Sequence, residues 1–465
     1  MEEQIYFYYT NDLHSKFDHW SQVSYFLKQS KRRCEVTGES CWTVDIGDHM
    51  DRVHPIAEAF KGQANTALLN EAGYDIVTLG NNEGITISHD ELHALYDEAK
   101  FTVVCGNLHD TIGKSPSWLQ SYTIVTSKQG VKIAVLGLTA PFNAYYELLG
   151  WHVSPPLEQL EHLLDTVNRE ADIIIVLSHL GYSEDCEIAR RFPNIDVIIG
   201  GHTHHLLKNG ERVNNSLLTA AGKNCYYVGE VILTWDHKQG KLKNKQAHTT
   251  NISHLPKDLD TEELLVAYEE QAKNRLAEPV VQLSSCLEVN WRKVTPVLQA
   301  LTEALKEQTN ADFAMLNAGV LLESLPKGVV TYGDIHRICP HPINTCVVEL
   351  TGSEIVEAIR SSLTEEFMEF QLKGFGFRGK MIGRMAFSGL TPQLEKLKDG
   401  AVFVKQVCQT RDVPLQPNQM YTLATADTFT FGRLIPEIAR SKMKKYYLPA
   451  FLRDILAQTL RRMYG

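Results

Sequence analysis

Five short stretches in the first half of the chain place histidine, aspartate or asparagine directly after an apolar run. They read "YYTNDLHS", "VDIGDHMDR", "VTLGNNE", "VLSHLG" and "IIGGHTHH". Imidazole nitrogens, carboxylate oxygens and amide oxygens are ligands that hard or borderline divalent cations accept, and the stretches contain no cysteine thiolate. This pattern predicts a metal site. Its candidate ligands are Asp12, His14, Asp48, Asn81, His179, His202 and His204.

These ligands suffice for two ions that share one carboxylate, Asp48. Two ions about 3.5–4 Å apart can share a hydroxide, lower its pKa and clamp a phosphoryl group during in-line attack. A histidine after a strand is more often a core or surface residue than a ligand, so the prediction depends on all the stretches together. The first ion is assigned Asp12, His14, Asp48 and His204, and the second Asp48, Asn81, His179 and His202.

Near-continuous apolar runs precede the candidate ligands, and such runs are typical of strands buried on both faces. They alternate with helical stretches such as 56–73 and 155–171. The alternation predicts an α/β layered domain whose sheet is at least partly parallel. Ligands of α/β sheets bind beyond the carboxyl ends of the strands, so we expect the loops to converge. The expected strands are 5–10, 41–48, 75–80, 101–107, 131–138, 172–179 and 194–201.

The bulk composition narrows the class of protein. At 465 residues the chain exceeds the size at which one core keeps growing, which predicts two domains. A formal net charge of −10 without a long basic run argues against a nucleic-acid duplex or a membrane as partner. The N-terminus lacks the basic start of a secretory signal, and no stretch approaches the ~20 apolar residues of a spanning helix. Nine cysteines without a C-x-x-C pair favour a cytoplasmic protein with free thiols.

A change from apolar to polar composition near residue 236 indicates how the chain divides into domains. The stretch 236–262 is polar and poor in periodic apolar residues, and a helical stretch with interleaved acidic and basic residues follows it. We expect a dimetal catalytic domain at 1–255, a linking helix within 256–285 and a second α/β domain at 286–465. Strands of the second domain are expected at 312–318 and 345–350.

The motifs "TNDLHS", "GD", "GNNE", "SHLG" and "GGHTHH" together resemble the signature of the metallophosphoesterase (calcineurin-like) superfamily, in its 5′-nucleotidase variant. The resemblance covers nearly the whole chain and is more specific in the first half. It implies a four-layer αββα sandwich that carries two divalent ions (Mn, Zn, Fe, Mg or Co), followed by an α/β 5′-nucleotidase-type substrate domain. It also implies a phosphohydrolase that releases phosphate from nucleotides by metal-bridged hydroxide attack.

Position 82 departs from the family pattern. The family has a catalytic histidine there, paired with an acid three residues on, whereas this chain has Asn82 and Ile85. Asparagine cannot donate a catalytic proton, and losing a positioned general acid costs ~10²–10⁴ in rate. We therefore expect an active enzyme that is slow or restricted in its leaving groups. The alternatives are a nucleotide phosphodiesterase or nucleotide-sugar hydrolase, and a non-catalytic sensor that binds metal and nucleotide.

The run "GDHMDR" is similar to the Gly-Asp-x-x-Asp-Arg run of the protein phosphatase branch, where the arginine grips the phosphate. By position Arg52 is a phosphate-clamp candidate, a role that suits its planar fork of donors. The alternative is that Arg52 lies on the surface at a helix start. Asp51 is expected to orient Arg52 or a water. For the nearby histidines we favour a structural or solvent-facing role over replacement of the lost proton donor; they are His49, His54 and His205.

Two aromatic segments of the second half, "KGFGFRGK" and "TADTFTFGR", resemble the family segments whose aromatic rings sandwich a nucleobase. A ring face binds a base for ~1–3 kcal/mol. In this reading Asp427 accepts from a ribose hydroxyl, and the arginines contact phosphate oxygens. The alternative is that the phenylalanines are core residues with the period of a strand. The substrate candidates are Asn317, Phe375, Phe377, Arg378, Arg384, Asp427, Phe429 and Phe431, with Arg433 beside them. The family's arginine after Asn-Ala-Gly is absent, because Val320 and Leu321 follow Gly319.

Overall fold

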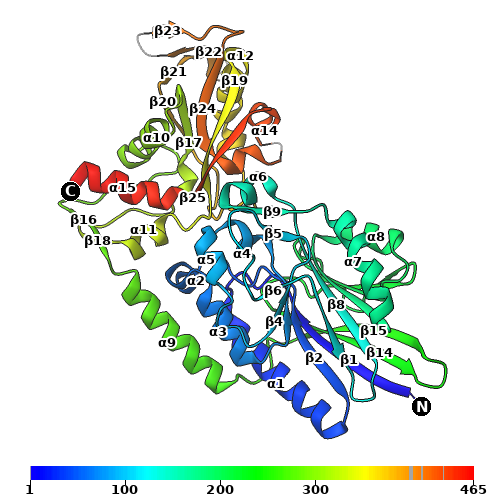
Figure 1. Ribbon diagram of the computed structural model, residues 1–465. Coiled ribbons are helices and arrows are strands. Elements are labelled where there is room, and N and C mark those ends of the chain that lie inside the picture. The colour runs from blue at the N-terminus through cyan, green and yellow to red at the C-terminus, as the bar shows by residue number, and fades with distance from the viewer. Residues whose placement is uncertain (1, 397–401, 410–411, 433) are drawn as a thin grey trace. The chain divides into compact units, whose positions relative to one another are not determined.

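The computed structural model describes residues 2–396, 402–409, 412–432 and 434–465. The chain forms two compact units, Met1–Ala272 and Lys273–Gly465 (Figure 1). The division falls inside helix α9 (Leu259–Arg275), which lies within the stretch expected to link the domains. Among the described residues, no helix combines the length and the apolar character that a membrane span requires.

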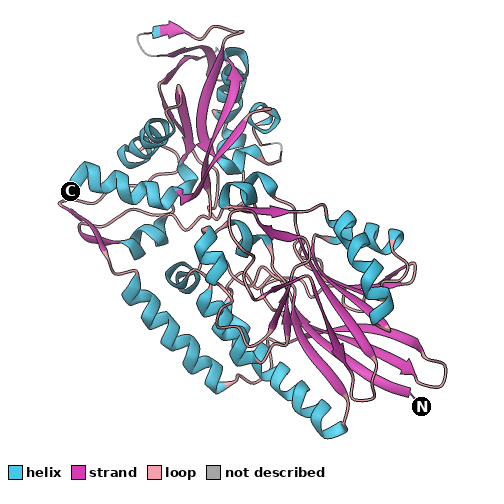
Figure 2. Ribbon diagram, in the orientation of Figure 1, coloured by secondary structure: helices cyan, strands magenta, loops and turns pink. Residues whose placement is uncertain are grey.

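The first unit is built on two mixed sheets (Figure 2). One sheet has the order β15 (Lys241–Asn251), β14 (Tyr227–Asp236), β1 (Glu2–Thr10), β2 (Ser40–Asp45), β3 (Ile76–Val77), β4 (Thr102–Val104) and β6 (Leu119–Gln120). The other has the order β12 (Glu211–Val213), β13 (Ser216–Thr219), β11 (Val197–Gly200), β10 (Ile173–His179), β8 (Lys132–Thr139) and β7 (Tyr122–Thr126). Neighbours from β1 to β6 are parallel, as are those from β8 to β13.

Apolar side chains from both sheets meet in one buried cluster, which includes Phe7, Val44, Val135 and Ile175. A second cluster packs the opposite face of the β10 sheet against helices α7 (Pro156–Glu170) and α8 (Tyr182–Arg191). Helix α1 (Trp20–Thr37) covers the outer face of the β1 sheet and contacts β2. The four layers confirm the αββα sandwich, and burial on both faces explains the near-continuous apolar runs.

Two local expectations were wrong. The helical stretch 56–73 is broken into α2 (Pro55–Phe60) and α3 (Gln63–Ala72), because Lys61 and Gly62 adopt left-handed φ angles of 50° and 89°. The polar stretch 236–262 contains β15, an edge strand paired antiparallel with β14. Strand β15 buries only a few side chains, among them Lys245 and Ala247, so it shows no apolar periodicity in the sequence.

The second unit has a five-stranded sheet covered by helices. Its order is β20 (Met385–Ser388), β17 (Phe313–Asn317), β24 (Met420–Ala426), β19 (Asn344–Thr351) and β25 (Lys444–Phe451). Strands β17 and β19 confirm the two strands that we expected in this domain. The helices that contact the sheet include α10 (Pro296–Thr309), α12 (Gly352–Ser362) and α15 (Leu452–Tyr464). A smaller sheet contains β21 (Leu390–Lys396), β22 (Val402–Gln409) and β23 (Val413–Pro414).

Candidate metal centre

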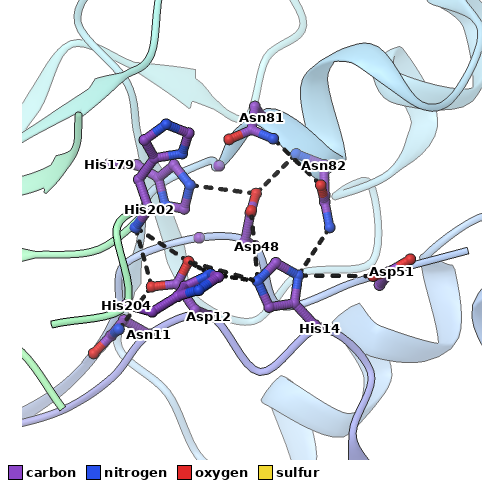
Figure 3. Close-up of polar contacts among 12 residues, drawn as sticks. Asn11, Asp12, His14, Asp48, Asp51, Asn81, Asn82, His179, His202 and His204 are labelled. Atoms are coloured by element: carbon purple, nitrogen blue, oxygen red, sulfur yellow. Dashed lines mark hydrogen bonds and ion pairs between the residues drawn. The ribbon is translucent and has the colours of Figure 1, made fainter. Parts of the chain in front are cut away.

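The predicted ligands meet at the carboxyl ends of the parallel strands (Figure 3). Asp12 and His14 follow β1, and Asp48 follows β2. Asn81 begins helix α4 (Asn81–Ile85) after β3. His179 ends β10, while His202 and His204 follow β11. Parallel strands deliver their carboxyl ends to one edge, so side chains far apart along the chain become neighbours.

One ligand group consists of Asp12, His14 and His204, whose ligand atoms lie within 4.8 Å of one another. The Nε2 atoms of His14 and His204 are 3.0 Å apart. Asp12 Oδ1 lies 3.8 Å from the first of these nitrogens and 3.5 Å from the second. Two imidazole nitrogens that face each other beside a carboxylate oxygen suit a shared divalent cation.

A second group consists of Asp12, Asp48 and His179, again within 4.8 Å. Asp48 Oδ1 lies 3.4 Å from His179 Nε2, and its Oδ2 lies 3.9 Å from His14 Nε2. The two oxygens of Asp48 thus face different groups, which is the geometry of a bridging carboxylate. Asp12 also belongs to both groups. The sequence analysis had assigned it to the first ion only.

Two buried atoms beside the second group accept or donate no hydrogen bond among the described residues: Asn81 Oδ1, and His179 Nε2, whose nearest charged neighbour is Asp48 Oδ1 at 3.4 Å. His179 Nδ1 lies 2.8 Å from the carbonyl oxygen of Ile46. Because a carbonyl only accepts, Nδ1 carries the proton and the Nε2 lone pair points into the site. Buried polar atoms are rarely left unpaired, so these two fit metal ligands.

His202 contributes its backbone as well as its ring. Its N–H donates to both oxygens of Asp12, at 3.1 and 3.0 Å, and its ring lies 5.3 Å from that of His179. Burial lowers the pKa of His202 and of His204 to about 4. Both rings are therefore neutral near pH 7, which is the form that binds a metal ion.

Most of the ligand residues adopt a left-handed backbone conformation. The φ angles are 52° for Asp12 and His14, 50° for Asp48, 69° for His202 and 58° for His204. Each such non-glycine residue costs roughly 1–2 kcal/mol. Strain of this kind clusters at functional sites, where the surrounding structure maintains it.

Glu83 is a positioning residue that the sequence reasoning missed. Its carboxylate accepts hydrogen bonds from the backbone N–H groups of Asp48 and Gly80, both at 2.9 Å, and of Met50 at 3.0 Å. It thereby joins the loop after β2 to the start of α4. Burial, reinforced by the charge of Asp48, raises the pKa of Glu83 to about 7. The only signal in the sequence is its place in "GNNE".

Asn11 is a second positioning residue that the reasoning missed. Its Nδ2 donates to Asp12 Oδ2 at 2.7 Å and to the Gly222 carbonyl at 2.6 Å. Its Oδ1 accepts from the N–H of Ala221 at 2.9 Å. Asn11 therefore fixes Asp12 against the segment after β13.

Asn82 lies inside the constellation. Its backbone N–H donates to Asp48 Oδ1 at 2.8 Å, and its Nδ2 donates to the Met50 carbonyl at 3.0 Å. The same Nδ2 is 3.0 Å from His14 Nδ1. Asp51 Oδ2 approaches that ring nitrogen at 3.8 Å. Asn82 and Asp51 thus flank His14, so Asp51 lies beside a ligand and not beside a phosphate clamp.

Arg52 does not have the environment that a phosphate clamp requires. Its Nε and Nη2 donate to the two carboxylate oxygens of Glu58 at 2.8 and 2.9 Å, and its Nη1 donates to the Thr86 carbonyl at 2.6 Å. Arg52 is 4% exposed, so it is not the surface residue of the alternative either. A buried bidentate ion pair of this kind is costly to break. The structure therefore corrects the clamp assignment to a structural role.

The three histidines near the motifs have the structural or solvent-facing environments that we favoured. His49 is buried against Trp20, and burial lowers its pKa to about 3. His54 accepts from the N–H of Ile56 and caps α2. His205 is exposed and stacks on Tyr182.

The four aromatic candidates of the second unit occupy two kinds of environment. Phe377 is 3% exposed and stacks on His341, and Phe429 is 1% exposed, so both are core residues. Phe375 is 51% exposed, and its ring lies parallel to that of Phe431, at 4° with centroids 5.8 Å apart. These segments are not strands: Phe375 has a φ of 50°, and Phe429 lies in a 3-10 helix, Asp427–Thr430.

The polar candidates of the second unit make hydrogen bonds or contacts with other residues of the same unit. Asn317 Nδ2 donates to the Ile382 carbonyl at 2.8 Å, and Asp427 Oδ2 accepts from the N–H of Asn344 at 3.1 Å; both side chains are buried. Both side chains are therefore held within their own unit, and their substrate roles stay predictions. Arg378 Nη1 donates to the Phe377 carbonyl, and Arg384 Nη1 lies 3.9 Å from Met368 Sδ. Arg433 lies outside the described residues.

The first unit is thus an αββα sandwich with carboxylates, imidazoles and an asparagine gathered at its strand ends, an arrangement suited to divalent metal ions. Residues 5–206 match the calcineurin-like phosphoesterase family, and residues 277–433 match the 5′-nucleotidase C-terminal domain. The chain is 40% identical to the uncharacterized metallophosphoesterase YunD of Bacillus subtilis over 461 residues, 99% of this chain and 100% of YunD. The protein therefore belongs to the metallophosphoesterase family, whose members hydrolyse phosphoesters with divalent metal ions.

More distant relatives have the same two-part organisation. The 5′-nucleotidase of Vibrio vulnificus is 23% identical, and the match covers 77% of this chain and 75% of that protein. Among solved structures, the NAD nucleotidase of Haemophilus influenzae has a TM-score of 0.67 at 15% identity, covering 99% of this chain and 96% of the other. A 5′-nucleotidase precursor from Thermus thermophilus has a TM-score of 0.60 at 19% identity, covering 99% and 97%. These structures establish the fold of both units.

Proposed function

We propose that the protein is a dimetal phosphohydrolase that releases phosphate from nucleotides. The observation that carries the proposal is the convergence of the seven predicted ligands, with the buried Asn81 Oδ1 lacking a hydrogen-bond partner and the buried His179 Nε2 facing Asp48 at 3.4 Å. Bound divalent ions polarise phosphoryl oxygens and provide a nucleophile from water at neutral pH. Asp12, His14 and His204 would hold one ion, and Asn81, His179 and His202 the other, with Asp48 between them.

The chain's own residues do the remaining work. The Ile46 carbonyl keeps the lone pair of His179 directed into the site, and Asn11 and Glu83 hold the loops of the two aspartates. The Nδ2 of Asn82 already donates to the Met50 carbonyl and lies 3.0 Å from His14 Nδ1, and an amide has no labile proton to transfer. We infer that the leaving oxygen takes its proton from water.

This limitation favours a second candidate function, hydrolysis of nucleotide phosphodiesters or nucleotide sugars. Cleavage of the pyrophosphate in a nucleotide sugar expels a phosphate, which is stable as an anion and needs no acid. A phosphodiester still expels an alkoxide, which a bound metal ion would have to stabilise. The observation behind it is that the amide of Asn82 occupies the place beside His14 and Asp48. Comparing kcat/KM for UMP with that for a UDP-sugar separates the two functions, since only the first requires protonation of an alkoxide.

Nucleotide specificity is proposed for the ring pair of Phe375 and Phe431. A base held between two rings needs about 7 Å between their planes, twice a stacking distance of ~3.4 Å. The centroids are 5.8 Å apart and the planes are no farther apart than that, so binding between the rings requires the planes to separate by at least about 1 Å. The exposed face of Phe375 is open to stacking without such a movement.

The primary test measures phosphate release from a panel of nucleotides with Mn²⁺ and with EDTA. We expect metal-dependent release, and Asp48→Asn should reduce kcat about 10²-fold or more, because second-shell changes alone cost 10–100-fold. Asp90→Asn is the matched control, since that carboxylate is fully exposed outside the centre. Nucleotide binding without phosphate release from any compound would support the sensor and contradict the proposal.

Base recognition is tested separately with AMP and ribose 5-phosphate, which differ only in the base. Phe375→Ala should lower the ratio of their kcat/KM values about 5- to 150-fold, equivalent to the ~1–3 kcal/mol of one stacked base. Phe370→Ala is the control, because Phe370 is also exposed, at 46%, but is not part of the pair. An unchanged ratio in Phe375→Ala would exclude the ring pair without affecting the phosphatase assignment.

A further inference from the structure

A cluster of sulfur, phenol and guanidinium groups lies between α1 and the β1 sheet, outside the metal centre. Tyr6 and Tyr8 of β1 point to the same face, because side chains two residues apart in a strand do so. Cys41 of β2 pairs in register with Tyr6, so its side chain shares this face. From α1, Cys34 Sγ lies 3.9 Å from the hydroxyl of Tyr8.

The register and this contact place the two thiols together. The side chains of Cys34 and Cys41 interact, and their interaction shifts the pKa values of the two thiols in opposite directions. The guanidinium of Arg33 covers the pair of tyrosines, with its central carbon 4.9 Å from the Tyr6 centroid and 5.9 Å from the Tyr8 centroid. Figure 1 shows α1 and β2 in the same part of the first unit.

This environment favours a thiolate. The interaction with Cys41, together with those with Tyr8 and Arg33, lowers the pKa of Cys34 to about 6 although burial opposes the charge. The same interaction raises the pKa of Cys41, so the two sulfurs share one proton at neutral pH. Cys34 is 1% exposed and Cys41 is partly exposed, which gives a small oxidant access from the Cys41 side.

We propose that Cys34 and Cys41 form a reversible oxidation site, in which a hydroperoxide converts the two thiols into a disulfide that ties α1 to β2. Redox-sensitive cysteines combine thiolate character, access and a neighbouring resolving cysteine, and this cluster has all three. Closing the link encloses residues 34–41.

The chemistry balances with the hydroperoxide as the two-electron oxidant. When the proton that the two sulfurs share moves from Cys41 to Cys34, the more exposed Cys41 becomes the thiolate. This thiolate attacks one peroxide oxygen, the O–O bond breaks, and the released alkoxide or hydroxide takes a proton from solvent to leave as alcohol or water. Cys41 is then a sulfenic acid. The sulfur of Cys34 attacks the Cys41 sulfur, the S–O bond breaks, and the departing hydroxide takes the Cys34 proton to leave as water. A dithiol reverses the link by exchange.

The test uses the full chain, fully reduced, treated with one equivalent of hydrogen peroxide at pH 7 and then alkylated. Trypsin places both cysteines in one peptide, 34–52, because cleavage follows Arg33 and Arg52. We expect that peptide to be lighter by two hydrogens and unalkylated, and the alkylatable thiols to fall from nine to seven. Dithiothreitol should restore nine.

Cys34→Ser should leave Cys41 as a sulfenic acid that dimedone traps, without a disulfide. Cys286→Ser is the control and should not alter the link, because Cys286 is exposed but stands in none of these contacts. Full alkylation of both thiols after peroxide, or a link from either cysteine to another residue, would overturn the proposal. The peptide readout is independent of phosphatase activity, so it stands or falls apart from the proposed function.

Discussion

Replacing Glu83 by glutamine tests whether this buried carboxylate holds the metal loops in place. Its Oε2 accepts from the N–H groups of Asp48 and Gly80, and its Oε1 accepts from that of Met50. Glutamine retains one oxygen. In the best orientation that oxygen still accepts from the N–H groups of Asp48 and Gly80. The new NH₂ group then faces the N–H of Met50, and because both groups are donors the hydrogen bond to Met50 is lost.

The cost has two parts. A hydrogen bond to a charged acceptor is worth about 1.5–3 kcal/mol, and a buried N–H left unpaired costs about 1–3 kcal/mol. Their sum is roughly 2.5–6 kcal/mol, and relaxation of the loop recovers some of it. Part of this energy should appear as lost stability and part as weaker metal binding, where changes behind a ligand typically cost 10–100-fold.

The assay is titration of Mn²⁺ by calorimetry at pH 8, where Glu83 is ionised because its pKa is about 7, together with thermal unfolding. Glu83→Gln should bind Mn²⁺ 10–100-fold more weakly. Glu91→Gln is the matched control, since Glu91 accepts from the N–H of Ser88 in a helix cap outside the centre. If Glu83→Gln bound Mn²⁺ like the wild type with an unchanged melting temperature, the positioning role would be refuted.

Three further predictions follow from single sites. Asn82→His should raise kcat for AMP at least about tenfold by restoring a proton donor, and an unchanged rate would mean that another group supplies the proton. Burial raises the pKa of Asp185 to about 8, so the unfolded chain releases this proton first and stability falls as pH rises from about 4 to 8. Asp185→Asn should remove that fall, as measured by urea unfolding, and parallel profiles would contradict it. Gly47→Ala should destabilise by about 3 kcal/mol or more, because its φ is 88° and a Cβ would lie 2.1 Å from Gly80 N. Gly38→Ala, at a φ of 77° with open space around it, isolates the backbone cost, and equal losses for the two would refute the steric argument.

The sequence predicted an α/β layered domain and the gathering of the ligands because both depend on local signals, whereas the four-layer sandwich was implied by the family resemblance. Buried parallel strands appear as apolar runs, and polar residues such as Asp48 and His179 stand at their ends. Whether each residue binds metal stays a prediction. The partners of other residues depend on tertiary packing, which no motif records. Arg52 matched a phosphate-clamp pattern, yet Glu58 takes up its guanidinium.

The second unit illustrates the same limit. The "FGF" and "FTF" runs suggested either rings that stack on a base or a strand. The backbone forms no strand in either run, and the rings within each run have different environments. Phe375 adopts a left-handed conformation that exposes its ring, whereas Phe377, two residues later, is buried on His341. Strand β15 was missed because an edge strand buries so few side chains that it has no apolar pattern.

Anomalous scattering from a crystal of the full chain soaked in manganese tests the central claim most directly. Two peaks about 3.5–4 Å apart are expected, with Asp48 touching both. One peak should contact His14 and His204, and the other His179 and Asn81. A single peak, or none with the histidines turned away from one another, would contradict the account.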